Sequence, residues 1–168
     1  MPYRRASAST SPEPRTDSRA AHDAAIALLA RRDFAGAELR DRLLSQGFDA
    51  ETAQSVASVL YQQGLLNDER YAQHYVAYHA GRGQGPIRIG AELRRRGLPA
   101  PLIEAALAGG PDWGALARRV RRAKFGIQPP VSWPQKARQA RFLQYRGFSS
   151  DHIQAATGAD LDTGSTGP

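Results

Sequence analysis

The apolar residues of this chain recur in one phrase that is repeated three times. Set on Gly47, Gly97 and Gly147, which lie fifty residues apart, the repeated segments are ELRDRLLSQGFDAETAQSV, ELRRRGLPAPLIEAAL and ARFLQYRGFSSDHIQAAT. Each has a leucine four positions before the glycine, an apolar residue directly after it, and an alanine or isoleucine six positions after it. A repeat of this period indicates one supersecondary unit copied in tandem, so the chain must be interpreted as an array.

Each phrase predicts a helix, a tight corner and a second helix. The apolar positions before Gly47 have helical spacing, and a glycine after the last turn accepts a positive φ without a Cβ clash. We therefore expect the three repeated glycines to be structural. After each corner stands a residue that favours the cap or first position of a helix: Asp49, Pro99 and Ser149.

A further helix precedes the phrase in each unit, and in the second unit Asn67 is its expected cap. In the third unit the segment FGIQPPVSWP lengthens the connection, because its glycine and adjacent prolines interrupt a helix. No segment alternates with the period of a strand. We expect nine helices, at residues 19–31, 35–46, 50–63, 67–80, 86–96, 99–108, 112–125, 134–146 and 150–157.

These elements predict an all-α fold of three tandem three-helix repeats that form an elongated, curved array. The repeats are expected at residues 19–65, 66–109 and 110–157. Each is about 45 residues long, near the size at which a single core is marginal, so neighbouring repeats should support one another. Residues 1–18 and 158–168 lack periodic apolar positions and are expected to be disordered tails.

Composition narrows the class of protein. Cysteine is absent, which excludes disulfides and thiolate metal sites and suits a reducing cytosol. No apolar run follows the Arg4–Arg5 pair as an export signal would require, and no stretch approaches the length of a membrane span. We expect a soluble, cytoplasmic protein.

Charge is distributed unevenly along the chain. Residues 1–80 carry 9 basic and 10 acidic side chains, residues 81–148 carry 14 and 3, and residues 149–168 carry 0 and 3. Single arginines in a last helical turn complement the helix dipole, but this does not account for a local excess of eleven charges. A nucleic-acid or nucleoprotein partner is favoured. The candidate interface residues are Arg82, Arg88, Arg94, Arg95, Arg96, Arg118, Arg119, Arg121, Arg122, Lys124, Arg138 and Arg141.

Other candidate chemistry is weak. Tyr71, Tyr75 and Tyr78 share one helical stripe and could stack bases, although a stripe at this spacing is more typical of a core. His74 and His79 are five residues apart, which does not place them on one helix face. The glycine-rich stretch at residues 81–90 has no lysine where a phosphate-binding loop needs one. We expect no catalytic residue, metal or cofactor, and therefore no enzyme.

Several phrases of the sequence resemble those of a known protein family. The phrases LLARRDFAGAELRDRLLSQGF, GLLNDERYAQHYVAYHAGRGQGPIRIGAELRRRG and RFLQYRGFS are similar to the successive repeats of the RecX family, the regulators of the RecA recombinase. The resemblance covers about residues 20–157. One departure is Ala35, where the family often has a capping serine, which leaves that cap to Asp33 or to water.

The resemblance implies a monomer that binds along the RecA filament on single-stranded DNA. It also implies a protein that inhibits strand exchange, ATP hydrolysis and co-protease functions of RecA, in DNA repair and the SOS response. Two alternatives stay open at this point. One is a DNA-binding protein of helix-turn-helix type that acts in transcription, because three-helix units have similar corners. The other is a scaffold that binds protein only.

Overall fold

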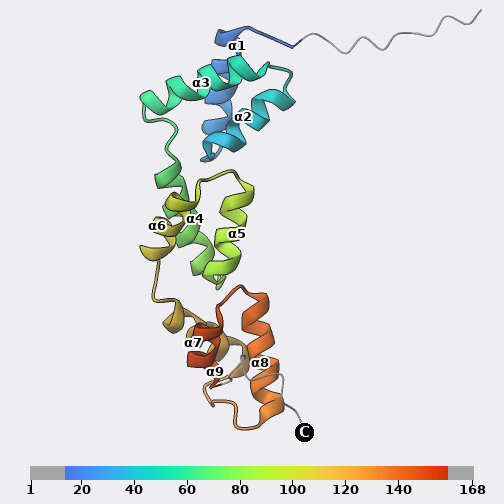
Figure 1. The fold of residues 1–168 in the computed structure, drawn as a ribbon, viewed down its shortest axis with the longest axis vertical. Helices are drawn as coiled ribbons and strands as arrows, with labels where there is room; N and C mark the ends of the chain where they lie inside the picture. Colours follow the sequence, from blue (N-terminus) through green and yellow to red (C-terminus); the bar gives the residue numbers. More distant parts are fainter. Residues whose placement is uncertain (1–13, 159–168) are drawn as a thin grey trace, which may run out of the picture.

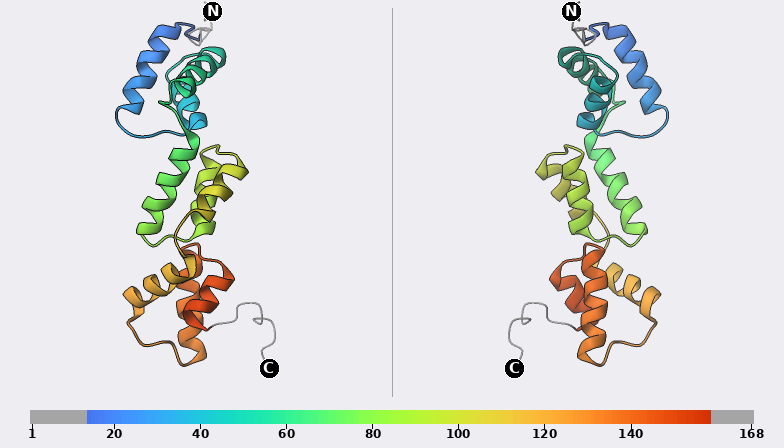
Figure 2. Two further views of the ribbon diagram at one scale, coloured as in Figure 1. Left: turned by 90° about the vertical axis from the view of Figure 1, so that its left-hand side faces the viewer. Right: turned by 90° about the vertical axis from the view of Figure 1, so that its right-hand side faces the viewer.

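The computed structural model describes residues 14–158 and confirms the predicted all-α array (Figure 1). Within these residues the chain forms nine helices, and its only β pairing is an isolated bridge between Arg15 and Phe48. Three units follow one another along the long axis without folding back, as both side views show (Figure 2). The first unit is α1 (Ser18–Leu29), α2 (Gly36–Ser45) and α3 (Ala50–Gln62). The second is α4 (Asp68–Gly81), α5 (Pro86–Arg95) and α6 (Ala100–Ala108), and the third is α7 (Trp113–Phe125), α8 (Trp133–Tyr145) and α9 (Ser150–Thr157).

The repeated glycines form the same corner in each unit. Gly47, Gly97 and Gly147 have φ values of +90°, +79° and +88°, as their position after a last helical turn predicts. In each corner the amide after the glycine donates to the carbonyl of the leucine four positions before it, at 3.2 Å in all three units. The apolar residue that carries this amide is buried, which ties the corner to the core.

The apolar core is divided unequally among the units. One cluster belongs to the first unit and is built around Leu39, Leu43 and Leu60. A second, larger cluster continues through the second and third units, from Tyr71 to Ile153, and includes Ala35 of the first unit. The second and third units therefore share one core, whereas the first unit has a largely separate core and contributes only Ala35 to the shared one.

The third unit docks on the second through the start of α5. The Gly85 amide donates to the Arg146 carbonyl at 2.8 Å, and the Ile87 amide donates to the Gly147 carbonyl at 3.0 Å. Amides in the first turn of a helix have no partner within that helix, so the corner of the next unit supplies partners. A Cβ on Gly147 would lie 2.7 Å from the Arg88 nitrogen, so only glycine fits this contact.

The corner of the first unit is covered by the chain that precedes α1. The Arg15 amide donates to the Gly47 carbonyl at 2.8 Å, and the Arg15 carbonyl accepts from the Asp49 amide at 3.1 Å. Asp17 then caps α1. The expectation that residues 1–18 form a disordered tail is therefore wrong for residues 14–18. The sequence also predicted a disordered tail at the C-terminal end. Residues 1–13 and 159–168, which make up the rest of the two predicted tails, lie outside the described residues.

The start of α2 also depends on another unit. Ala35 has no side chain to cap this helix, and the expected substitute, Asp33, does not supply the cap. Instead the Gly36 amide donates to Oδ1 of Asp68, at the start of α4, at 2.8 Å. Oδ2 of the same carboxylate accepts from the Tyr61 hydroxyl at 2.8 Å. Burial, followed by this hydrogen bond, raises the pKa of Tyr61.

At the start of α8, side chains of the same segment bind the free backbone amides. Ser132 and Gln135 form a reciprocal capping box, in which the Gln135 Oε1 accepts from the Val131 and Ser132 amides at 3.0 and 3.4 Å. Pro134 occupies the second helical position and has no amide hydrogen to donate. This helix therefore begins without help from another unit.

Candidate nucleic-acid and protein interface

The predicted basic residues lie on the second and third units, but the structure divides them into exposed and buried groups. Arg118 and Arg96 are half-buried, and Arg121 is buried. The others are exposed: Arg82, Arg88, Arg94, Arg95, Arg119, Arg122, Lys124, Arg138 and Arg141.

Four cations meet at the junction of the second and third units. Arg82 follows α4, Arg119 and Lys124 lie on α7, and Arg146 follows α8; together they surround a hollow of about 440 Å³. We call this hollow the basic pocket. Among the described residues no acidic side chain lines it. A pocket with four cations and no carboxylate is suited to bind a phosphate or a carboxylate of a partner.

The backbone of the corner between α4 and α5 brings these cations together. Gly83 has a φ of +78°, which lets the chain turn directly after Arg82. The Arg146 guanidinium donates to the Arg82 carbonyl at 3.2 Å and lies 5.2 Å from the ring centre of Phe142. Arg146 is absent from the candidate residues chosen from the sequence. Its place directly before a repeated glycine, in a unit with excess positive charge, was the available signal.

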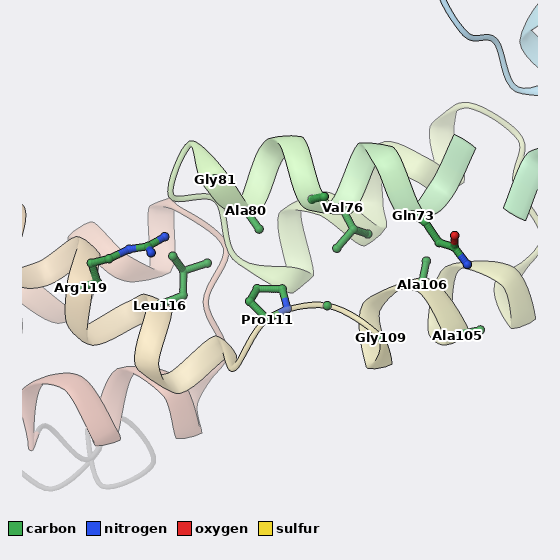
Figure 3. A pocket seen from close by; sticks show the side chains of 12 residues that line it. Gln73, Val76, Ala80, Gly81, Ala105, Ala106, Gly109, Pro111, Leu116 and Arg119 are labelled. Carbon is green, nitrogen blue, oxygen red and sulfur yellow. The ribbon is translucent and has the colours of Figure 1, made fainter. Parts of the chain in front are cut away.

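An apolar groove adjoins the basic pocket. It has a volume of about 550 Å³ and lies between α4, α6 and the first turns of α7. Figure 3 shows Val76 and Ala80 on one wall, Ala106 on another, and Leu116 beside Arg119 at one end. The two hollows share Gly81 and Arg119. A partner that places an apolar side chain in the groove can therefore place a neighbouring anionic group against Arg119.

Arg121 is not part of this surface, which corrects the prediction from the sequence. Only 3% of the residue is exposed, since its guanidinium is directed into the connection between α7 and α8. It donates to the carbonyls of Gly126, Ile127 and Gln128 at 3.1, 3.1 and 2.9 Å, and to the side chain of Gln139 at 3.4 Å. Because these contacts use its donors, Arg121 holds the lengthened connection and is unavailable to a partner.

The arginines of the run Arg94–Arg96 also differ from one another in their contacts. Arg95 forms an ion pair with Glu92 one turn earlier on α5. Arg96 points toward the first unit, where it donates to Glu38 at 3.1 Å and its guanidinium lies 5.1 Å from the ring centre of Tyr75. Burial opposes ionisation of Glu38, but the guanidinium groups of Arg32 and Arg96 prevail and lower its pKa. Arg96 thus acts mainly between units.

Residues 14–158 contain neither a metal site nor a membrane-spanning helix. No three His, Cys, Asp or Glu side chains come together there as a metal site. In the same residues no helix is both long enough and apolar enough to cross a bilayer. The basic pocket and the apolar groove, which share Gly81 and Arg119, form the main candidate site.

The fold and this site define a three-helix repeat protein with a basic surface, and comparison with known proteins specifies the family. Three family models match in order: "RecX, first three-helix domain" at residues 21–58, "RecX, second three-helix domain" at residues 67–107 and "RecX, third three-helix domain" at residues 114–157. The chain belongs to the RecX family.

Relatives cover nearly the same length. The chain is 41% identical over 152 residues to "Regulatory protein RecX" of Halorhodospira halophila, covering 90% of this chain and 94% of the relative. It is 40% identical over 139 residues to the protein of the same name from Xanthomonas citri, covering 82% and 86%. The crystal structure of RecX from Lactobacillus salivarius has the same fold, with a TM-score of 0.74 at 21% identity, covering 83% of this chain and 94% of that chain.

Proposed function

We propose that this protein regulates the RecA recombinase by binding along the RecA filament on single-stranded DNA. In this proposal it limits the recombinase, ATPase and co-protease activities of RecA. Membership of the RecX family, whose relatives are named regulatory proteins, supports a regulator. The observation that carries the mode of binding is the convergence of Arg82, Arg119, Lys124 and Arg146 beside an apolar groove.

The two hollows suit the two components of such a filament. The basic pocket offers charge-assisted hydrogen bonds to DNA phosphates or to acidic side chains of the protein. The apolar groove, which has aliphatic walls and no aromatic ring, suits an apolar side chain of the protein better than a base. Contacts with both components would favour the assembled filament over free DNA.

The elongated shape of the protein would allow it to bind over a long stretch of the filament. The three units follow one another in a row (Figure 1), and the exposed basic residues are distributed over the second and third of them. A body of this shape can contact several RecA protomers at once, and it would change filament growth without any chemical step. We accordingly propose a non-enzymatic, cytoplasmic monomer.

The decisive experiment measures ATP hydrolysis by RecA on single-stranded DNA while this protein is titrated in. We expect inhibition at less than one molecule per RecA protomer and no ATP hydrolysis by the protein alone. An unchanged RecA rate at equimolar protein would contradict the proposal. Sequence-specific binding to duplex DNA, with RecA unaffected, would instead support a transcription factor.

A pair of charge-reversed variants tests the location of the site. Arg119→Glu with Lys124→Glu should abolish most inhibition, because both cations line the basic pocket. The control is Arg31→Glu with Arg42→Glu in the first unit, which changes the net charge equally. Arg42 and Lys124 both lie in a last helical turn, so the cost to the helix dipole is matched as well. Equal loss of inhibition in both variants would contradict the assignment to the basic pocket.

A further inference from the structure

A third hollow lies at the junction of the first and second units, and its chemistry differs from that of the basic pocket and the apolar groove. It encloses about 710 Å³, and its lining includes Tyr71, Tyr75 and Tyr78 of α4 together with Arg32, Glu38 and Arg96. We call it the junction hollow. Aromatic and charged groups thus meet in one concave site that the basic pocket does not include.

The tyrosines form a series from the core to the solvent. Tyr71 is 7% exposed and belongs to the core, as the stripe predicted, but Tyr78 is 60% exposed. The rings of Tyr71 and Tyr75 are stacked with centres 6.0 Å apart, and His79 lies 4.1 Å from Tyr75 and 5.1 Å from Tyr78. An exposed ring held by such neighbours is a preformed stacking surface, because little side-chain freedom remains to be lost on binding.

The charges that line the junction hollow balance one another. Glu38 accepts from Arg32 at 2.7 Å and from Arg96 at 3.1 Å, and Asp33 lies 3.4 Å from His74. Two guanidinium groups therefore face two carboxylates, and a phosphate gains little net attraction here. A neutral planar group with both donors and acceptors on its edge is better matched, and a nucleobase has this chemistry.

Arg82 connects the junction hollow to the basic pocket. Its guanidinium donates to the Tyr78 hydroxyl at 2.7 Å and lies 5.3 Å from the centre of that ring. Tyr78 and Arg82 are one turn apart on the surface of α4 and its last turn, and Arg82 also lines the basic pocket. A strand whose base rests on Tyr78 can therefore place its next phosphate at Arg82 and continue toward the other cations.

We propose that the junction hollow binds one unpaired base of single-stranded DNA, stacked on Tyr78, with an adjoining phosphate at Arg82. The proposal rests on the proposed function in taking single-stranded DNA as the polyanion. The site would select single strands, since the bases of a duplex are already paired and stacked. The base contact would be tolerant of sequence, because every base has a π-face.

The test compares two labelled ligands of equal charge by fluorescence anisotropy: an oligonucleotide of twenty thymidines, and a twenty-residue abasic strand of the same backbone. We expect the wild-type protein to bind the abasic strand about 10-fold more weakly, the size expected for loss of base stacking. Tyr78→Leu should lower thymidine-strand affinity to the abasic level and leave abasic affinity unchanged. Because phosphate contacts persist, the dependence on salt should be the same for both proteins.

The matched control is Tyr145→Leu, because Tyr145 is an exposed tyrosine of the third unit with Arg88 5.9 Å from its ring centre. We expect no effect of this change on either ligand. Equal wild-type affinity for both ligands, no binding to either, or equal effects of the two tyrosine changes would overturn the proposal. So would a Tyr78→Leu protein that loses inhibition of RecA but binds the thymidine strand normally, because the hollow would then take protein.

Different experimental outcomes would contradict the base site and the proposed function. Inhibition of RecA without discrimination between the two ligands would remove the base site and leave the proposed function intact. Discrimination between the ligands without inhibition of RecA would support the base site and contradict the proposed function.

Discussion

Arg96 of the second unit donates a hydrogen bond to Glu38 of the first unit at 3.1 Å, between residues 58 positions apart in the chain. Arg32 binds the same carboxylate from the first unit at 2.7 Å. With the contact between Gly36 and Asp68, these bonds connect two units whose apolar clusters are largely separate. The junction of the first and second units is therefore held mainly by polar contacts, unlike the junction that follows it.

Replacing the shared carboxylate should loosen the first junction. Glu38→Gln leaves two guanidinium groups without their anion, and we expect a loss of about 1–2 kcal/mol in the free energy of unfolding. Urea denaturation would measure it, and X-ray scattering should show a broader range of overall dimensions. Glu104→Gln, at an exposed position of α6, is the control and should change neither. Identical results for the two variants would contradict this role of Glu38.

Stability should fall in mildly acidic solution because of His79. Burial, together with the nearby charges of Arg96 and Arg82, lowers the pKa of His79 below its ordinary value of 6.5. The unfolded chain then binds a proton more readily than the folded protein does, so the contribution of His79 is present above pH 6.5 and is lost as the pH falls below it. Thermal unfolding of the wild-type protein and of His79→Gln should be measured between about pH 8 and pH 5, a range that includes the ordinary pKa of histidine. The stability of the variant should depend less steeply on pH than that of the wild type. Parallel curves would refute this prediction.

Two matched glycine changes should separate backbone strain from docking. Gly47→Ala and Gly147→Ala both place a side chain at a positive φ, which costs roughly 1–2 kcal/mol. A Cβ at Gly47 meets no atom within 4 Å, whereas a Cβ at Gly147 would lie 2.4 Å from the Cβ of Arg88. We expect Gly147→Ala to cost at least about 2 kcal/mol more in urea denaturation, a value typical of a steric clash in a packed contact. Equal losses would show that the third unit can shift freely against the second.

Removing the buried arginine should damage the third unit. Arg121→Met leaves three carbonyls of the connection between α7 and α8 without their donor, and hydrogen bonds to charged groups contribute roughly 1.5–3 kcal/mol each. We expect a loss of about 3 kcal/mol and rapid proteolysis between residues 126 and 132. Arg122→Met, at the next and exposed position, should stay within about 0.5 kcal/mol of the wild type. Similar protease sensitivity in the two variants would contradict the structural role of Arg121.

Local signals were sufficient to predict the helices and corners. The glycine corners depend on φ at one residue and on hydrogen bonds within one turn, so Gly47, Gly97 and Gly147 were predictable in detail. The caps at Asn67, Asp49 and Ser149 are local for the same reason. Helix ends differ from the predicted ones by no more than two residues.

Contacts between distant residues could not be predicted in this way. The cap of α2 comes from Asp68, 32 residues away, because the docking of two units places that carboxylate at Gly36. The burial of Arg121 depends on the path of an irregular connection, and its neighbour Arg122 has the same charge and a similar local sequence. The sequence therefore located the basic region but not which of its side chains face outward.

The start of α8 offers no free amide to the corner of a further unit. In the second unit, the amides of Gly85 and Ile87 receive the corner of the following unit. At the corresponding places in the third unit, the Ser132 amide is engaged by Gln135, and Pro134 has no hydrogen to offer. Arg15 occupies the corner at the opposite end. Copies of this protein therefore cannot join head to tail by the backbone hydrogen bonds that join its second and third units.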